Sequence, residues 1–378
     1  MGNTYEEKLK MEWEKFSSKK NKFFPNIMLL GATGCGKSSL INLIFDKEIA
    51  PVNDVSRGTT EFKTYWGTDY DMNVNLIDSR GYEMNDGNGE TFSNYYKAIK
   101  NKLEESSQKD PLEKIHIIWF CISVAAKRIQ DYDIEILKLL QKEPELKNRV
   151  AIVLTKCDQD DEDGSIAKKI KEIISSDIKN SIPSFEVSTD LDLELDLKKL
   201  MVWSSNQLDD EDLREAFISS QMVSLKMKQK AAQKKIAFYA ASAAAIGATP
   251  IPMTDSALLI PLQCTMSTHI IHIYGMENFA SISSALLGDI IVSNLGKSLA
   301  GGLIKLIPGI GTLIGGVINA GVASLITSAL GFAISTICFE SCKKIANGES
   351  IDMSNVFGIE AIQTLVKQYM SHNKNKNT

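Results

Sequence analysis

An eight-residue segment near the N-terminus has the residue types and spacing that hold a chain of phosphates. The segment GATGCGKS, 31–38, fits the pattern G-x-x-x-x-G-K-[ST] and follows a short apolar run. Its glycines let backbone N–H groups turn inward around an anion, and a helix that begins near Lys37 adds its positive end. Lys37 would reach the β and γ phosphates, and Ser38 would supply a hydroxyl to Mg²⁺. The predicted nucleotide-binding residues of this loop are Gly31, Ala32, Thr33, Gly34, Cys35, Gly36, Lys37, Ser38 and Ser39.

A second motif, LTKCD at 154–158, predicts which base the site accepts. The carboxylate of Asp158 follows an apolar run and can accept two hydrogen bonds, from the N1–H and the exocyclic amino group of guanine. Adenine offers no such pair of donors, so with adenine the acceptor would stay unpaired at a cost in free energy. Two roles are open for Lys156, because its stem can lie along the base or its amine can brace the phosphate loop.

Two further segments would sense the terminal phosphate. In LIDSRGYE, 76–83, Asp78 ends an apolar run and can hold Mg²⁺ through water. The N–H of Gly81 can contact the γ-phosphate and so move a loop when that phosphate leaves. The other segment, SRGTTEF at 56–62, supplies a threonine for Mg²⁺.

These motifs need a sheet to position them, and residues 26–203 show the alternation expected of one. Short apolar runs alternate with stretches of helical spacing, such as 91–105 and 131–143, which predicts an α/β fold with a mainly parallel sheet flanked by helices. The predicted strands are NIMLL, FKTYWGT, VNLID, IHIIWFCISV, RVAIVLT and SFEVST.

The composition changes after about residue 205. Segment 206–235 is acidic at its start and basic at its end, which suits a helix macrodipole. From Ile236 to Phe339 small and apolar residues dominate without strand-like alternation, so we expect an all-α, apolar, Gly/Ala-rich helical domain. The formal charges of that stretch are Asp255, Glu277, Asp289, Lys297 and Lys305. The expected organisation is an N-terminal helix at 1–22, a nucleotide-binding domain at 23–205, a helical domain at 206–345, and a C-terminal helix with a frayed tail at 346–378.

The motifs of 23–205 resemble those of a translation-factor-class GTPase of the Era-like or septin-like kind, and this form of phosphate loop is also seen in immunity-related GTPases. LTKCD matches the N/T-K-x-D guanine box with threonine in first place. The resemblance implies GTP or GDP with Mg²⁺ as ligands, and it favours Thr60 over Thr59 in the segment 56–62. The base-contacting residues that it implies are Thr155, Lys156, Asp158, Ser188 and Thr189. The implied Mg²⁺ ligands are Ser38, Thr60 and Asp78.

The sequence departs from this family at the residues that promote hydrolysis. Tyr82 stands where many small GTPases have a glutamine that orients the attacking water, and Gly34 replaces the asparagine of potassium-dependent members. We therefore expect slow hydrolysis without a partner. Arg57 and Arg80 can stabilise transition-state charge, in cis or across a homodimer. The alternative interpretation is that each is an ordinary solvated arginine without a role in hydrolysis. The catalytic candidates are Lys37, Thr60, Gly81, Arg57 and Arg80.

The apolar half resembles the domain of unknown function 697 family, which occurs fused to bacterial GTPases, on the segments TDSALLIPLQCTMSTHIIHIYG and LIPGIGTLIGG. Two interpretations stay open for 236–339. In one it inserts into or lies on a membrane, since the uncharged run from Leu306 is long enough to span about 30 Å and a basic cluster precedes it. That cluster is Lys226, Lys228, Lys230, Lys234 and Lys235. In the other it is a soluble bundle, because Pro308 and many glycines interrupt the run and asparagines such as Asn319 are costly in lipid.

The net charge and the cysteines of the whole sequence indicate which classes of partner and which compartment to expect. The formal net charge is −5, so we expect no nucleic acid partner. The six cysteines are scattered and are expected to be free thiols of a cytoplasmic protein, peripheral or integral to the inner face of a membrane. The predicted function is a GTP hydrolase that acts as a switch coupled to the helical domain. A self-assembling, dynamin-like membrane-remodelling GTPase and a ribosome-assembly GTPase are the alternatives.

Overall fold

The chain divides into two units by its internal contacts. The computed structural model describes Met11 and residues 24–51, 62–79, 90–190, 193, 195–248, 255–276, 320–352 and 356–376. One unit is Phe23–Ser224, and the other combines Met1–Lys22 with Leu225–Thr378. The division therefore falls after residue 224 and not after residue 205, where the change in composition had placed it.

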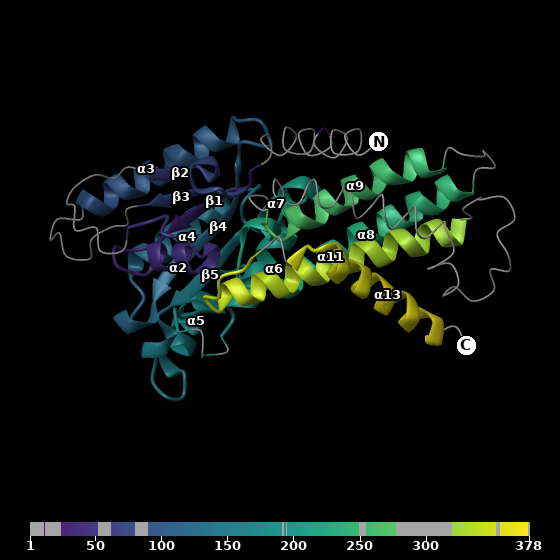
Figure 1. Ribbon diagram of the computed structural model, residues 1–378. Helices are drawn as coiled ribbons and strands as arrows, with labels where there is room; N and C mark the ends of the chain where they lie inside the picture. Colours follow the sequence, from purple (N-terminus) through teal and green to yellow (C-terminus); the bar gives the residue numbers. More distant parts are fainter. Residues whose placement is uncertain are drawn as a thin grey trace, which may run out of the picture. The chain divides into compact units, whose positions relative to one another are not determined.

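The first unit is built on a six-stranded sheet in the order β2-β3-β1-β4-β5-β6 (Figure 1). Its strands are β1 (Asn26–Leu30), β2 (Phe62–Tyr65), β3 (Asn75–Ser79), β4 (Ile115–Ser123), β5 (Val150–Thr155) and β6 (Ser184–Glu186). The pairing of β2 with β3 is antiparallel and every other pairing is parallel. The prediction of a mainly parallel sheet is confirmed, and each strand lies within its predicted run except β3, which extends one residue beyond it to Ser79.

Helices cover both faces of this sheet, which is why β4 and β5 are buried along their whole length. The helices are α2 (Lys37–Phe45), α3 (Glu90–Ser107), α4 (Asp131–Lys142), α5 (Ser165–Asp177), α6 (Leu197–Gln207) and α7 (Glu211–Ser220). Apolar side chains of α3, α4 and α5 share one core with Phe120 of β4. The preceding residue, Trp119, points to the opposite face, where its Nε1 donates to Ser204 Oγ of α6 at 3.0 Å.

A buried polar cluster joins β1, β3 and β4 at their amino ends. The backbone N–H of Asn26 donates to Nδ1 of His116 at 3.0 Å, and Nδ2 of Asn75 donates to Oδ1 of Asn26 at 2.9 Å. The other ring nitrogen of His116 lies 3.1 Å from the carbonyl oxygen of Pro111. Burial lowers the pKa of His116 to about 4, so the ring is neutral at pH 7 and Nδ1 is free to accept.

The described part of the second unit is helical, as predicted for the second half of the chain. Its helices are α8 (Leu225–Gly247), α9 (Asp255–Ile273), α11 (Ala320–Ala346) and α13 (Ile359–Lys376). Helix α8 packs against α9 and α11, and α13 packs against α11 (Figure 1). A frayed tail was expected at the end of 346–378, but helix α13 continues to Lys376.

Helix α11 is long and apolar enough to cross a membrane, and it is the one such helix in the described ranges. Most of its apolar stretch, 67%, is buried inside the protein, which is also typical of the central helix of a soluble bundle. Polar contacts join it to α9: Gln263 Nε2 donates to Thr327 Oγ1 at 3.1 Å, and Tyr274 just beyond α9 shares a hydrogen bond with Ser335 at 3.0 Å.

The basic cluster before the apolar region is not one exposed patch. Lys228 is fully buried, and its Nζ donates to the carbonyl oxygen of Tyr274 at 2.9 Å, just beyond the C-terminal end of α9. Lys226, Lys230 and Lys234 are exposed, whereas Lys235 is half-buried. The inclusion of Lys228 among lysines that could meet lipid was therefore wrong.

Candidate functional site

The predicted phosphate loop connects the C-terminal end of β1 to α2, with three glycines in backbone conformations that other residues rarely adopt. The φ angles of Gly31, Gly34 and Gly36 are 136°, 74° and 97°. Gly31 is further constrained by space, because a Cβ atom there would lie 2.2 Å from the carbonyl oxygen of Cys121 on β4. Gly36 immediately precedes α2, so the loop leads into the N-terminus of that helix.

Lys37 is buried in the loop that it would serve. Its Nζ donates to the carbonyl oxygens of Gly31 and Ala32 at 3.0 and 3.1 Å, and Sγ of Cys35 lies 3.9 Å away. Burial opposes the charge on Lys37, but the electrostatic influence of neighbours, Cys35 first and Asp78 among them, raises the net pKa. Lys37 is therefore a fixed ammonium group beneath the phosphate position.

Asp78 lies one residue before the end of β3 with its Oδ1 atom buried and without a hydrogen-bond partner in the described ranges. Burial raises the pKa of Asp78 to about 6, although the positive charges of Lys37 and Lys63 oppose the shift. An orphaned carboxylate oxygen is costly unless a ligand completes it. The donor set is the hard oxygen type that Mg²⁺ prefers, so the residue fits a magnesium site.

The base side of the site is tied to the phosphate loop by two consecutive residues. The hydroxyl of Thr155 donates to the carbonyl oxygens of Cys35 and, at 3.3 Å, of Ile122. Lys156 has a left-handed backbone, φ 57°, and its Nζ donates to the carbonyl oxygen of Gly34 at 2.8 Å. Of the two roles open for Lys156, the structure shows the one in which its amine braces the phosphate loop.

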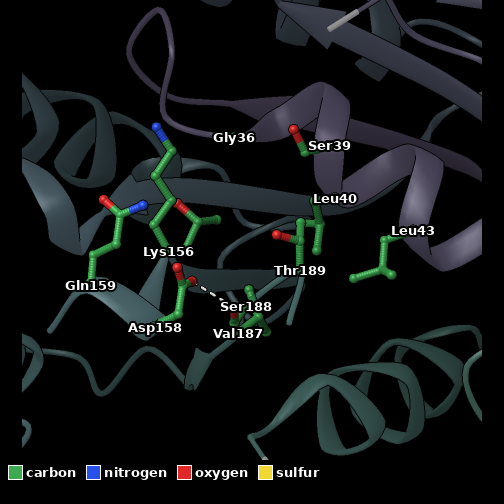
Figure 2. A pocket seen from close by; sticks show the side chains of 11 residues that line it. Gly36, Ser39, Leu40, Leu43, Lys156, Asp158, Gln159, Val187, Ser188 and Thr189 are labelled. Carbon is green, nitrogen blue, oxygen red and sulfur yellow. Dashed lines mark hydrogen bonds between the residues drawn. The ribbon is translucent and has the colours of Figure 1, made fainter. Parts of the chain in front are cut away.

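A pocket of about 130 Å³ lies between these loops and α2 (Figure 2). Asp158 and Ser188 come together in it, with the Ser188 hydroxyl donating to Oδ1 of Asp158 at 2.5 Å. The backbone N–H of Asp190 donates to Ser188 Oγ at 2.9 Å, which leaves the serine hydroxyl hydrogen for the carboxylate. The lining residues are Gly36, Ser39, Leu40, Leu43, Thr155, Lys156, Asp158, Gln159, Val187, Ser188 and Thr189.

The structure thus brings all five residues of the predicted base site together with Gly36 and Ser39 of the phosphate loop. Figure 2 shows Lys156, Asp158 and Gln159 on one side of the pocket and Leu40 and Leu43 of α2 on the other. Four residues of the predicted set fall outside the described residues, namely Thr60, Gly81, Arg57 and Arg80. Tyr82, where the sequence departs from the family pattern, also lies outside them.

Tyr95 of α3 contacts the site and was not predicted. Its hydroxyl accepts a hydrogen bond from the backbone N–H of Gly31 at 3.3 Å and shares one with Ser79 Oγ at 2.8 Å. Burial is the main cause that raises the pKa of Tyr95 to about 12, so the phenol keeps its proton. The side chain therefore connects the start of the phosphate loop, the end of β3 beside Asp78, and α3.

The sequence analysis also missed four residues that line the pocket, because nothing in their type distinguishes them from ordinary helix and loop positions. These are Leu40, Leu43, Gln159 and Val187.

Comparison with known proteins agrees with this geometry. Residues 26–156 match the family described as 50S ribosome-binding GTPase. Cell division control protein 10 of Candida albicans is 26% identical over 148 residues, which cover 34% of this chain and 40% of that protein. The chain thus spans less than half the length of that relative.

Two solved structures are also similar to this chain. A protein described as a probable GTP-binding protein engB is 15% identical, with 48% of this chain and 97% of that chain covered and a TM-score of 0.36. Toc33 from Arabidopsis thaliana, in complex with Mg²⁺ and GMPPNP, is 16% identical, with 57% and 93% covered and a TM-score of 0.34.

The family match runs from the first residue of β1 to Lys156, so it includes the phosphate loop, Asp78 and the start of the base motif. Together with the sheet order and the loop geometry, this identifies a P-loop GTPase fold, followed by a helical region. Guanine nucleotide is the ligand class of such a domain.

Proposed function

We propose that this chain hydrolyses GTP to GDP and phosphate and acts as a nucleotide-dependent switch. The observation that carries the proposal is the position of Asp158, whose carboxylate faces the same pocket as Gly36 and Ser39 of the phosphate loop. Ser188 holds that carboxylate from one side, leaving acceptor capacity for the two adjacent donors of guanine. The pocket thus joins a base-selective acceptor to a phosphate-binding loop.

The residues divide the chemistry of phosphoryl transfer between them. Lys37 holds its positive charge where the β and γ phosphates would lie, and Ser38, Asp78 and Thr60 would hold Mg²⁺. When bound, the metal neutralises charge on the phosphate oxygens. The N–H of Gly81 would report the loss of the γ-phosphate. Because Tyr82 has no amide to orient water, we propose that hydrolysis is slow until a partner or a second copy supplies a group.

The base assignment is tested by Asp158→Asn in isothermal titration calorimetry. Guanine donates two hydrogen bonds to the carboxylate, whereas xanthine presents a carbonyl in place of the exocyclic amine and matches an amide better. We expect the variant to bind GTP about tenfold or more weakly and to gain relative affinity for xanthosine triphosphate. An unchanged preference for GTP, or equal uptake of ATP and GTP by the unaltered chain, contradicts the proposal.

A matched control for this change is Glu162→Gln. Glu162 is exposed in the loop that follows the base motif and does not line the pocket. The substitution removes the same charge at a nearby position, so it separates loss of a base contact from a general change in local electrostatics. We expect its nucleotide preference to equal that of the unaltered chain.

We further propose that the helical region, which resembles the domain of unknown function 697 family, couples the switch to the inner face of a membrane. Lys226, Lys230 and Lys234 are exposed and four residues apart on α8, which places them along one side of the helix. Phe238, one further step along, is 65% exposed. Lysines beside an exposed aromatic ring suit the surface of an anionic bilayer.

Flotation with lipid vesicles tests this coupling. The doubly substituted chain Lys230→Glu, Lys234→Glu should float less with vesicles that contain phosphatidylserine, whereas Lys168→Glu, Lys169→Glu on the exposed side of α5 should float like the unaltered chain. Runs with GDP, GTP and a non-hydrolysable analogue show whether the nucleotide controls binding. If no nucleotide state floats with anionic vesicles, the membrane proposal is wrong while the GTPase proposal stands.

Two further candidates follow from specific features. The description of the matched family favours binding to the large ribosomal subunit, which co-sedimentation with purified 50S subunits would detect. The lack of a glutamine at Tyr82 favours self-assembly through the GTPase domain, as in the dynamin-like alternative. In that case turnover per molecule should rise with protein concentration.

A further inference from the structure

The hydroxyl of Tyr95 joins the ends of the two strands that lead to the phosphate loop and to the predicted magnesium ligand. The paired register of β1 and β3 ends at Leu29, opposite Asp78. Beyond that level, the Tyr95 hydroxyl accepts a hydrogen bond from the backbone N–H of Gly31 at 3.3 Å and shares one with Ser79 Oγ at 2.8 Å. It therefore continues the connection between the two strands past their last paired residues.

This connection is buried and reaches the phosphate-binding lysine. Tyr95 and Ser79 are each 2% exposed. Gly31 is confined against β4, because a Cβ atom there would lie 2.2 Å from the carbonyl oxygen of Cys121. The carbonyl oxygen of Gly31 in turn accepts from Nζ of Lys37 at 3.0 Å. Three hydrogen bonds in series thus join the end of β3 to the ammonium group of Lys37.

The series of hydrogen bonds acts on Asp78 through the backbone of β3. Successive side chains of a strand point to opposite faces, so Ser79 lies on the same side as Ile77, which shares a core with Tyr95, and Asp78 lies on the other side. Oδ1 of Asp78 is buried and has no hydrogen-bond partner in the described part of the chain. Because no hydrogen bond fixes that oxygen there, its distance from the phosphate loop depends on how β3 is held against β1.

We propose that Tyr95 is a positioning residue for Mg²⁺, which holds Asp78 and Lys37 at the spacing that lets the metal ion and the phosphates of GTP bind together. The inference rests on the proposed function and deepens it, because it gives α3 a part in metal-dependent nucleotide binding. Without the hydroxyl, the phosphate loop and β3 each keep their own conformation but are no longer fixed at that spacing. The loss therefore falls on the cooperation between metal and nucleotide more than on the nucleotide alone.

The test measures how much Mg²⁺ raises the affinity of the full chain for a non-hydrolysable GTP analogue. Calorimetry with saturating Mg²⁺ and again with EDTA gives this enhancement as a ratio of two affinities. We expect Tyr95→Phe to reduce the enhancement about fivefold or more, while the affinity in EDTA changes by less than about threefold. Ser79→Ala should reduce it to a similar extent. The double variant should lose little more than either, because the two hydroxyls act through one hydrogen bond.

Tyr96→Phe is the matched control, since it removes a hydroxyl from the neighbouring, half-buried tyrosine of the same helix. We expect it to keep the full enhancement by Mg²⁺. Both affinities of a variant are measured on one preparation, so a partly unfolded sample of Tyr95→Phe lowers both and leaves their ratio unchanged.

Two results would overturn the inference and leave the GTPase proposal standing. One is an equal loss of affinity with and without Mg²⁺ in Tyr95→Phe, which would limit the residue to shaping the phosphate loop. The other is a full enhancement by Mg²⁺ in that variant. By contrast, an unaltered chain that binds no guanine nucleotide would refute the proposed function and this inference with it.

Discussion

Single residues outside the phosphate-binding motif hold its loop in shape. Thr155 and Lys156 donate to carbonyl oxygens on the loop, and Tyr95 accepts from its first N–H group. These contacts come from the last residue of β5, the residue that follows it, and α3, which are all far from the loop in sequence. The loop is therefore presented to its ligand by tertiary contacts as well as by its own glycines, which reduces the ordering that binding must supply.

Tyr95→Phe should weaken the site without changing its shape. The substitution leaves the N–H of Gly31 and the hydroxyl of Ser79 buried with one partner fewer, so we expect the free energy of unfolding to fall by about 1–3 kcal/mol and GTP affinity to fall with it. Chemical denaturation and calorimetry measure the two effects. Tyr96→Phe, on the half-buried side of the same helix, serves as the control and should change stability by less than about 0.5 kcal/mol. Equal effects of the two substitutions would contradict the role given to Tyr95.

Among the elements, β1, β3 and β4 are fixed to one another at the ends opposite the site. Asn26 accepts from Asn75 and donates through its backbone to His116, and all three residues are buried. Because Nδ1 of His116 accepts a backbone N–H, protonation of the ring would break this bond and place a charge in the interior. The register of the strands that carry the phosphate loop and Asp78 thus depends on a neutral histidine.

Acid should unfold the first unit partly through this histidine. The folded pKa of about 4 lies below the unfolded value near 6.5, so the contribution to stability is present above about pH 6.5 and is lost as the pH falls through about 4. The loss is on the order of 3 kcal/mol. We expect His116→Gln to be less stable at pH 7 but to show a shallower fall in the free energy of unfolding between pH 6.5 and pH 4.5. Parallel curves, measured by urea denaturation, would show that another group titrates.

At the scale of the whole molecule, the chain is two folding units whose division lies after α7. The hydroxyls of Ser219 and Ser220 accept from Asn73, and the backbone N–H of Met222 donates to the carbonyl oxygen of Ile44. Phe217 is fully buried. Residues 206–224 therefore complete the GTPase unit, even though their charge pattern differs from what precedes them.

Truncation distinguishes the two boundaries. A fragment of residues 23–224 should unfold cooperatively and bind GTP, because it keeps Phe217 and the serine contacts of α7. A fragment of residues 23–205 should be less stable by several kcal/mol, since it exposes the surface that α7 covers. Circular dichroism during thermal unfolding measures the difference. If the two fragments were equally stable, the boundary between the units would lie near residue 205, where the composition changes.

How far the sequence predicts this molecule depends on whether a feature is local. The strands and the phosphate loop were predicted because their signals lie in consecutive residues. These signals are apolar runs for strands buried on both faces, glycines for the loop conformation, and the pattern of the helix that follows the loop. The base site was predicted by its motif, and the structure brings those residues into one pocket. Tyr95 could not be predicted, because its role depends on how α3 packs against β1 and β3.

The errors have the same physical origin. Five lysines close together in 226–235 suggested one exposed cluster, but helical periodicity turns Lys228 inward to a carbonyl oxygen on another segment. The boundary was placed at the change in charge because α7 is amphipathic and acidic at its start, which resembles the opening of a new helical domain. Both corrections required knowledge of the partner that each segment packs against.

The hydrogen bond from Lys156 to Gly34 makes the two ends of the ligand thermodynamically interdependent. The base site and the phosphate loop share this hydrogen bond, so binding of a ligand at either one should increase the affinity of the other. Guanosine and free pyrophosphate should accordingly show positive cooperativity when titrated together. Lys156→Ala removes the hydrogen bond to Gly34, so this variant should bind each of the two ligands more weakly and nearly independently of the other.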